Sequence, residues 1–225
     1  MPCAEGRYKY QGIIILKITV ISDTHGQHKK IGRMSGDVLI HCGDMFNLFE
    51  PSGYDVDMMD DWFGKQNFDL ILCVGGNHDN DLQDRYEVEG NPFNNAVFLC
   101  DESYEYKGIK FYGAPWVPEL YRQAFFKENE DLAETWSKIP NDTDVLITHT
   151  PLKGVLDKSS RGASYGCPYL AEAVKRVKPR FHCFGHVHNS AGSLSKAGTT
   201  YINAAMAGRH HELVRGGFQF EIDVE

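Results

Sequence analysis

The stretch Leu70–Asp79, LILCVGGNHD, joins an apolar run to a polar cluster that begins with two glycines. The run Leu70–Val74 has the length and composition of a buried strand. Gly75 and Gly76 permit a sharp turn off that strand. The turn then carries an amide, an imidazole and a carboxylate in succession: Asn77, His78 and Asp79. Taken alone, such a cluster is also compatible with a turn that caps a helix.

Four further polar clusters each follow another strand-like run. The clusters are Asp23-Thr24-His25, Gly43-Asp44, Thr148-His149-Thr150 and Gly185-His186-Val187-His188. The runs before them are Ile13–Ser22, Val38–Cys42, Val145–Ile147 and Phe181–Phe184. Asp, Asn and His are ligand types that hold divalent cations in proteins. Five such clusters at the same end of five predicted strands therefore predict one shared metal site.

Helical and hairpin patterns fill the rest of the chain. Apolar periodicity predicts helices over Asp57–Gln66, Pro118–Lys138 and Pro168–Val177. Further strands are predicted over Glu102–Tyr106, Ile109–Gly113, Thr199–Asn203 and Phe218–Val224. This mixture predicts one mixed sheet or two packed sheets with helices outside. Ligands in such folds collect at the carboxyl ends of strands, where every cluster lies.

Length and composition indicate a single globular domain. We expect residues 1–11 to form a loose leader and residues 12–225 to form the domain, since 225 residues suffice for one core. A formal net charge of −8 argues against an extended nucleic-acid surface. No stretch approaches the roughly 20 apolar residues of a membrane span. The six cysteines form no C-x-x-C pair, so we expect them to be reduced, as in a cytoplasmic protein.

Spacing within the clusters suggests how two ions could be bound. Asp23 and His25 are two residues apart, as are His186 and His188, so on extended backbone each pair faces one side. Asp44 is a natural bridging carboxylate because each of its two oxygens can reach one ion. Two ions about 4 Å apart can clamp a phosphoryl or carboxyl group during displacement. The mixed ligand set favours Mn, Fe, Zn or Mg.

The remaining cluster residues have more than one possible role. Asn77 can offer a carbonyl oxygen to a metal ion, and His149 can ligate one or be structural. His78 need not be a ligand and could donate a proton or stabilise an oxyanion. Asp79 could then orient the His78 imidazole through a hydrogen bond.

In this order, the motifs D-x-H, G-D, G-N-H-D, a separate His and G-H-x-H resemble the calcineurin-like metallophosphoesterase superfamily. They span residues 23–188. The segments Asp144–Pro151, Gly166-Cys167 and Thr199–Ala204 are similar to the small metallophosphoesterase-domain-containing phosphodiesterases. The resemblance implies an α/β (α+β) fold. Its architecture would be a single-domain, four-layer αββα sandwich of two mixed β-sheets flanked by helices.

The resemblance also implies a ligand set for two divalent ions, with Mn²⁺ expected and Fe, Zn or Mg as alternatives. Seven side chains would hold them: Asp23, His25 and His188 on one ion, Asn77, His149 and His186 on the other, and Asp44 on both. His78 would contact the phosphate and protonate the leaving oxygen, with Asp79 behind it.

The function implied is hydrolysis of small phosphodiesters such as cyclic nucleotides by a metal-bridging hydroxide. The partner would be a small phosphate ester, with a nucleotide as one candidate. A metal-dependent phosphomonoesterase, acting on small molecules or on phosphoproteins, is the alternative. A non-catalytic scaffold on the same fold is a third hypothesis, disfavoured because every ligand position is filled.

Several residues outside the motifs are expected near the site. Asn203 ends a late strand and is expected behind the ligands, and His28 is expected at the rim. His41 is expected to buttress a strand end. Arg161 and Arg209 are candidates for phosphate contact, but exposed surface charge is the favoured interpretation for each. The tail from Arg209 onwards carries no motif that we assign to the site.

Overall fold

Two six-stranded sheets form the centre of the computed structural model, which describes residues 9–10, 13–47, 55–118 and 120–224. The first sheet contains β1 (Lys9–Tyr10), β2 (Ile13–Ile21), β3 (Ser35–His41), β4 (Asn67–Cys73), β5 (Val97–Phe98) and β12 (Phe218–Val224). The second contains β6 (Glu102–Tyr106), β7 (Ile109–Ala114), β8 (Val145–Thr148), β9 (Phe181–Phe184), β10 (Gly192–Lys196) and β11 (Thr199–Asn203).

Both sheets are mixed. In the first, β2, β3, β4 and β5 run parallel, while β1 and β12 pair antiparallel with β2. In the second, β11, β9, β8 and β7 run parallel, and β10 and β6 are antiparallel edge strands. Most of the expected leader lies outside the described residues, and the part within them forms β1.

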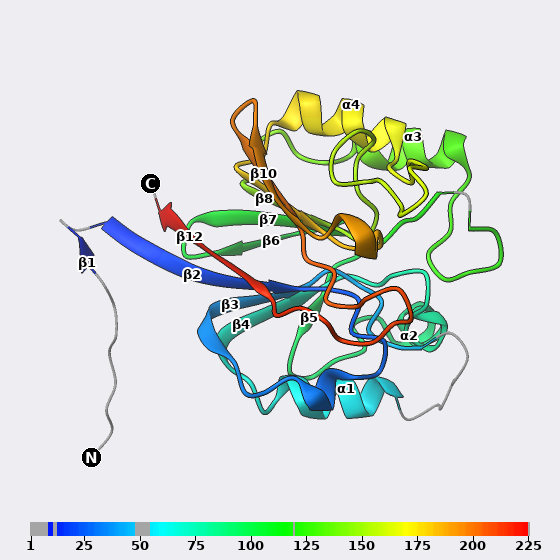
Figure 1. The fold of residues 1–225 in the computed structure, drawn as a ribbon. Helices are drawn as coiled ribbons and strands as arrows, with labels where there is room; N and C mark the ends of the chain where they lie inside the picture. The colour runs from blue at the N-terminus through cyan, green and yellow to red at the C-terminus, as the bar shows by residue number, and fades with distance from the viewer. Residues whose placement is uncertain (1–8, 11–12, 48–54, 119, 225) are drawn as a thin grey trace, which may run out of the picture.

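Helices cover the outer face of each sheet, which confirms the predicted four-layer αββα sandwich (Figure 1). Helices α1 (Asp55–Phe63) and α2 (Asn80–Glu89) cover the first sheet. Helices α3 (Asn129–Ser137) and α4 (Pro168–Val177) cover the second. The short 3₁₀ helices η1 (His28–Lys30) and η2 (His188–Ser190) follow β2 and β9. None of the helices in the described residues has the length and apolar composition that a membrane span requires.

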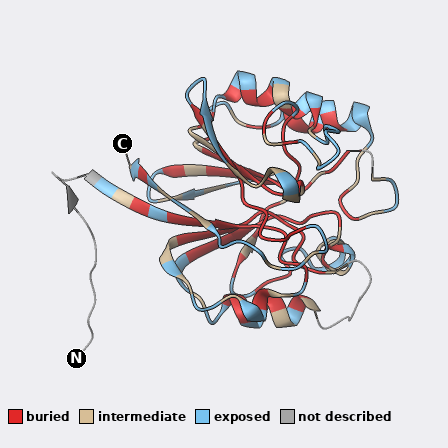
Figure 2. Cartoon of the chain, viewed as in Figure 1, coloured by how far each residue is buried: buried red, intermediate tan, exposed pale blue. Residues whose placement is uncertain are grey.

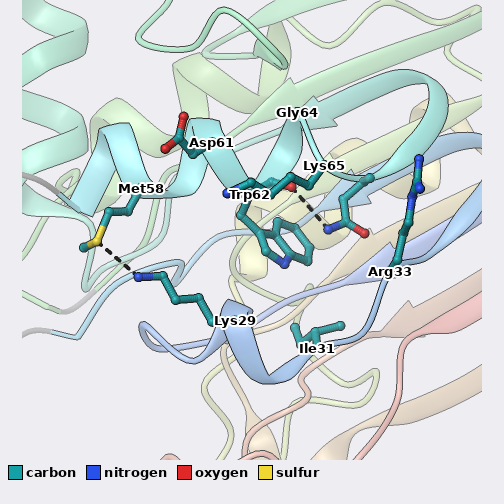
Figure 3. A pocket seen from close by; sticks show the side chains of 9 residues that line it. Lys29, Ile31, Arg33, Met58, Asp61, Trp62, Gly64 and Lys65 are labelled. Atoms are coloured by element: carbon teal, nitrogen blue, oxygen red, sulfur yellow. Dashed lines mark hydrogen bonds between the residues drawn. The ribbon is translucent and has the colours of Figure 1, made fainter.

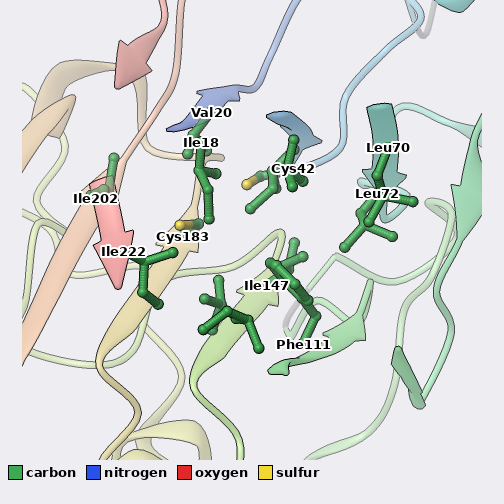
Figure 4. Packing of buried hydrophobic residues seen from close by; sticks show 14 of the residues in the cluster. Ile18, Val20, Cys42, Leu70, Leu72, Phe111, Ile147, Cys183, Ile202 and Ile222 are labelled. Atoms are coloured by element: carbon green, nitrogen blue, oxygen red, sulfur yellow. The ribbon is translucent and has the colours of Figure 1, made fainter. Parts of the chain in front are cut away.

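Alternating side chains assign the two faces of each central strand. Leu70, Leu72 and Val74 face the second sheet, where they meet side chains from β7 and β8 (Figure 4). Ile71 and Cys73 instead pack on the helix side. Both faces of these strands are therefore buried (Figure 2). Burial on both faces explains why the strands read as continuous apolar runs in the sequence.

The long helix predicted over Pro118–Lys138 is wrong in its first half, because the only helix in the described part of that range is α3. Arg122 and Phe125 adopt positive φ values of 70° and 52°, which a right-handed helix cannot contain. Phe125 is buried and lies directly against Gly75. The apolar spacing of this segment therefore reflects a buried turn that packs on Gly75 and not one face of a helix. The other two predicted helices correspond to α1 and α4.

The two sheets join at the edge where the polar clusters lie. Ser22, directly after β2, forms a parallel bridge with Ala205, which follows β11. The Ser22 carbonyl also accepts a hydrogen bond from the Met206 amide at 3.0 Å. Strands of both sheets therefore deliver their carboxyl ends to one place.

Candidate metal centre

Five strands contribute to the cluster, three from one sheet and two from the other. Asp23 and His25 follow β2, Asp44 follows β3, and Asn77 follows β4, all in the first sheet. His149, His186 and His188 follow β8 and β9 of the second sheet. All seven predicted ligands therefore lie at the seam between the sheets.

The pairs Asp23/His25 and His186/His188 are not on extended backbone, so the expectation that each pair faces one side of a strand is wrong. Asp23, His25, Asp44 and His186 have positive φ values of 56°, 42°, 53° and 68°. His188 begins the 3₁₀ helix η2. Non-glycine residues with positive φ are uncommon and persist only where the surrounding structure holds them. The direction of these side chains is therefore set by tight turns with left-handed backbone conformation, and not by the alternation of side chains along a strand.

Hydrogen bonds between the loops after β2 and β3 hold these turns. The Asp23 amide donates to the Gly43 carbonyl at 2.9 Å. His41 accepts a hydrogen bond at Nδ1 from the Gly43 amide at 3.2 Å, so its Nε2 carries the proton and donates to Thr24 Oγ1 at 3.1 Å. His41 therefore buttresses the strand end and is not directed at the metal site.

One group of ligand atoms surrounds Asp23. His188 Nε2 lies 3.1 Å from Asp23 Oδ1, and His25 Nε2 lies 3.2 Å from His188 Nε2. The Asp23 carboxylate also accepts the His186 amide at 3.0 and 3.1 Å. Three side chains from two sheets thus converge on one point, as the resemblance implies for one ion.

A second group surrounds His149, and Asp44 lies between the two groups. His149 Nε2 lies 3.0 Å from Asn77 Oδ1 and 3.4 Å from Asp44 Oδ1. The His149 and His186 rings are 5.0 Å apart. The other carboxylate oxygen of Asp44, Oδ2, lies 4.0 Å from His25 Nε2. Each oxygen of Asp44 thus faces a different group, which is the arrangement a bridging ligand needs.

Backbone carbonyls fix the tautomers of three histidines. Each donates a hydrogen bond from Nδ1: His25 to Phe46 (3.2 Å), His149 to Cys42 (2.8 Å) and His188 to Gly208 (2.9 Å). A carbonyl only accepts, so Nδ1 carries a proton and a neutral ring directs its Nε2 lone pair into the cluster. Neutral His25 and His188 would then point lone pairs at each other across 3.2 Å, and a divalent ion bound by both nitrogens would remove that repulsion. This donor set fits divalent metal ions.

Buried charges shift the pKa values of the cluster in opposite directions. Burial lowers the pKa of both His25 and His186 to about 4, which keeps these imidazoles neutral. Burial also opposes charge on His149, but the neighbouring Asp44 outweighs it and raises the pKa of His149 to about 9. Burial alone would raise the pKa of Asp44, yet His149 holds it well below its usual range. Without metal, a proton on His149 therefore balances the carboxylate.

Asp79 braces the loops beside the cluster. Its Oδ1 accepts the Phe46 amide at 3.0 Å and its Oδ2 accepts the Gly76 amide at 2.8 Å. Burial and the nearby Asp44 raise the pKa of Asp79 to about 8. The His78 amide donates to Asp44 Oδ1 at 2.9 Å, while its imidazole is partly exposed. Orientation of that imidazole by Asp79 stays a prediction.

The two residues expected around the ligands differ in outcome. Asn203 is buried, and its Nδ2 donates to the carbonyl of Val187 at 3.0 Å, between the two ligands of the last motif. It therefore lies behind the ligands, where the sequence reasoning put it. His28 is buried with 3% exposure and packs against Trp62, at 5.9 Å between ring centres, so its expected rim position is wrong.

A cavity of about 330 Å³ opens beside the cluster. Its metal-side wall is formed by Asn77, His78, His186 and His188. Neutral side chains form most of the remaining lining: Leu120, Gln123, Ser159, Ser160, Tyr165, Val187 and Asn189. Of the two candidate arginines, Arg209 lines the cavity, whereas Arg161 is not among the described residues that line it.

A larger cavity, of about 650 Å³, lies elsewhere, between η1 and α1 (Figure 3). It is lined by Lys29, Arg33 and Lys65 around Trp62, together with apolar side chains. None of its lining residues belongs to the metal-side cluster. Size alone therefore does not identify the substrate site, and the smaller cavity is the one beside the candidate chemistry.

His211 is a member of the site that the sequence reasoning missed. Its ring stacks on His25, with ring centres 4.2 Å apart and planes 14° apart. It also lies 5.3 Å from the His78 ring and 5.5 Å from the His188 ring. The tail that carries it has no motif, so only the folded chain brings it to the cluster.

Comparisons with known proteins agree with this geometry. Residues 16–190 match the family described as calcineurin-like phosphoesterase. The chain is 34% identical over 216 residues to UPF0046 protein K07C11.7 of Caenorhabditis elegans, covering 90% of this chain and 73% of that protein. It is 32% identical over 216 residues to metallophosphoesterase domain-containing protein 1 of Homo sapiens, covering 84% of this chain and 66% of that protein.

Solved structures share the fold at low sequence identity. The protein TT1561 of Thermus thermophilus superposes with a TM-score of 0.55 at 12% identity, covering 84% of this chain and 88% of that chain. Another solved structure reaches a TM-score of 0.65 at 15% identity, covering 84% and 90%. These likenesses show the fold alone.

Replacement of Gly76 by alanine should weaken metal binding. A Cβ at this position would lie 2.3 Å from Asp44 Oδ1 and 2.4 Å from the Asp44 backbone nitrogen, so Asp44 must shift as a whole. We expect metal affinity to fall by about 10- to 100-fold, as for other residues that support metal ligands. Gly32→Ala is the matched control, because a Cβ there meets nothing within 4 Å. Equal metal content of the two purified variants by elemental analysis would contradict this role.

Metal loading should release protons. The pKa of His149 is raised to about 9, so this imidazole is protonated at neutral pH and must lose its proton to bind an ion. Apparent affinity should therefore rise as pH increases towards about 9 and then level off. Titration calorimetry at about pH 7, in buffers of different ionisation enthalpy, measures the released protons. Heats that do not depend on the buffer would refute the account.

Proposed function

The chain belongs to the calcineurin-like phosphoesterase family and is a hydrolase of phosphoric esters, and we propose that its substrates are small phosphodiesters such as cyclic nucleotides. The observation that carries the proposal is the sharing of Asp44 between two groups of ligand atoms. Candidate ligand atoms of Asp44, His149 and His186 lie within 4.8 Å of one another, and Asp44 Oδ2 lies 4.0 Å from His25 Nε2. Two ions held there would supply Lewis-acid stabilisation of phosphoryl oxygens and a water-derived nucleophile at neutral pH.

We propose Mn²⁺ as the native ion, with Fe, Zn or Mg as alternatives. The proposal is supported by the donor set, which mixes imidazole nitrogens with carboxylate and amide oxygens. The Asn77 amide nitrogen donates to Gln123 Oε1 at 2.7 Å, which leaves its carbonyl oxygen to face the cluster. Asn77 can therefore offer oxygen rather than nitrogen to an ion.

We propose that His78 protonates the leaving oxygen. Its imidazole lines the cavity and is partly exposed, unlike the buried imidazoles of His25 and His149. Its backbone amide donates to Asp44 Oδ1 at 2.9 Å, which positions the His78 backbone next to that ligand. A group with that position can reach an ester oxygen bound in the cavity.

Cavity size and lining support a small diester. A volume of about 330 Å³ is at the small end of ligand pockets. Neutral side chains such as Gln123, Ser159 and Tyr165 suit the second ester group of a diester, which carries no charge of its own. Arg209, also in the lining, favours the alternative of a phosphomonoester, because a monoester carries more negative charge.

We also keep the expectation of a cytoplasmic location. It is supported by the cysteines in the described part of the chain, none of which forms a disulfide: Cys42, Cys73, Cys100, Cys167 and Cys183. Free thiols are typical of a reducing compartment.

Hydrolysis assays after chelation and reloading test the function. The protein would be stripped of metal, reloaded with Mn²⁺ or Mg²⁺, and offered cyclic nucleotides, an aryl diester and the matching aryl monoester. We expect activity to return with metal, highest with Mn²⁺, and the diester to be cleaved faster. Faster monoester cleavage would favour the alternative. Absence of any hydrolysis would leave the scaffold hypothesis.

Replacement of His78 by alanine should lower turnover by roughly 10²-fold or more, as for loss of a general acid. The loss should be larger for an alkyl leaving group than for a nitrophenyl group, since a good leaving group needs less protonation. Metal content should stay unchanged. Equal losses for both leaving groups would refute proton donation by His78.

A further inference from the structure

The segment after β11 forms a tight loop over the metal-side cluster. Ala207 and Leu213 form an antiparallel bridge at its base. Inside the loop, the Gly208 amide donates to the Glu212 carbonyl at 2.7 Å. At the tip, the side-chain amide of Gln27 donates to the carbonyl of His211. The loop is therefore held both at its base and against the loop that follows β2.

This loop contacts the ligands directly at two points. The Gly208 carbonyl accepts the Nδ1–H of His188 at 2.9 Å and so fixes that imidazole. Three residues further on, the His211 ring stacks on the His25 ring at 4.2 Å. The same loop therefore holds one ligand and covers another.

The backbone of His211 shares a feature with the ligands. Its φ of 63° lies in the left-handed region, as do the φ values of Asp23, His25, Asp44 and His186. Such conformations persist in non-glycine residues only where the surroundings hold them, and they concentrate at functional sites. The positive φ of His211 is an observation separate from its ring contacts, and it also indicates that this residue belongs to the functional site.

Ring geometry separates His211 from the metal ligands. Nitrogen atoms of His25, His188 and His211 lie within 4.8 Å of one another. However, the His25 and His211 planes are nearly parallel, 14° apart, and stacked. Nitrogen lone pairs lie in the ring plane, and the nearly parallel His211 ring is stacked above the His25 ring, so one ion could not be held in the planes of both rings. The His211 nitrogens are therefore better placed for a molecule bound above the ions.

Resting on the function proposed above, we propose that His211 is a substrate-binding residue that donates an N–H to a phosphoryl oxygen. His78 approaches the His211 ring edge-on, with ring centres 5.3 Å apart and planes 70° apart. Arg209, two residues before His211, lines the substrate cavity. The two rings are in contact at this distance, so the phosphoryl group would lie against the edges of both imidazoles rather than between them. His211 is not itself among the described residues that line the cavity, so its N–H would reach an oxygen at the margin of the cavity, near Arg209. A neutral imidazole always carries one N–H, so the contact needs no change of protonation.

The matched pair His211→Phe and His210→Ala tests this role. Phenylalanine keeps an aromatic ring to stack on His25 but removes the N–H. His210 is the adjacent histidine and is exposed. Metal content, kcat and KM for the aryl diester, and the Kd of inorganic phosphate for the Mn²⁺-loaded protein would be measured for both variants. His211→Gln, which keeps an N–H donor, provides the rescue.

We expect His211→Phe to retain two ions. It should bind phosphate roughly 10- to 100-fold more weakly, because one hydrogen bond to a charged group is lost. A similar loss is expected in kcat/KM. His210→Ala should match the parent protein, and His211→Gln should recover part of the loss. Loss of metal from His211→Phe, or phosphate affinity equal to that of His210→Ala, would overturn the proposal. If the parent protein hydrolyses no ester, the proposed function fails, while the phosphate titrations still decide the role of His211.

Discussion

The arrangement of this site depends on the burial of one carboxylate, that of Asp44, between two groups of imidazoles. Its Oδ1 accepts the His78 amide and faces His149, while its Oδ2 faces His25. The residue is 2% exposed, and an isolated carboxylate at that depth would be very unfavourable. Positive charge must therefore accompany it, either as a proton on His149 or as bound metal ions. The same interaction explains the raised pKa of His149, about 9, and the lowered pKa of Asp44.

The carboxylate also couples the site to the fold. First-sheet strands carry Asp23, His25 and Asp44, and second-sheet strands carry the histidines of the last two motifs. Ions held by both sets would bind only when the two sheets are packed together, so binding would stabilise that packing. Glycines make the approach possible: a Cβ on Gly185 would lie 2.2 Å from Asp23 Oδ2. The glycines in these motifs are thus requirements of close packing between the sheets.

Local sequence was enough to predict nine strands, namely β2, β3, β4, β6, β7, β8, β9, β11 and β12, but not β1, β5, β10 or helix α2. The seven candidate ligands also come from short sequence patterns, and their role as ligands stays a prediction. Apolar runs identify strands buried on two faces, and the polar residues that follow them must gather at one sheet edge. Features decided by distant contacts were not predictable in this way. Phe125 has a positive φ and packs against Gly75 where the long helix was expected, and His28 is buried against Trp62 instead of lying at the rim. His211 reaches His25 only because the last loop folds back across the seam.

Electron paramagnetic resonance of the protein loaded with two equivalents of Mn²⁺ tests the central claim most directly. If Asp44 bridges two ions about 4 Å apart, the spins must be exchange-coupled. The expected spectrum is that of a coupled dinuclear centre, which Asp44→Asn should abolish. A spectrum of isolated Mn²⁺ at full loading of the parent protein would contradict a bridged pair.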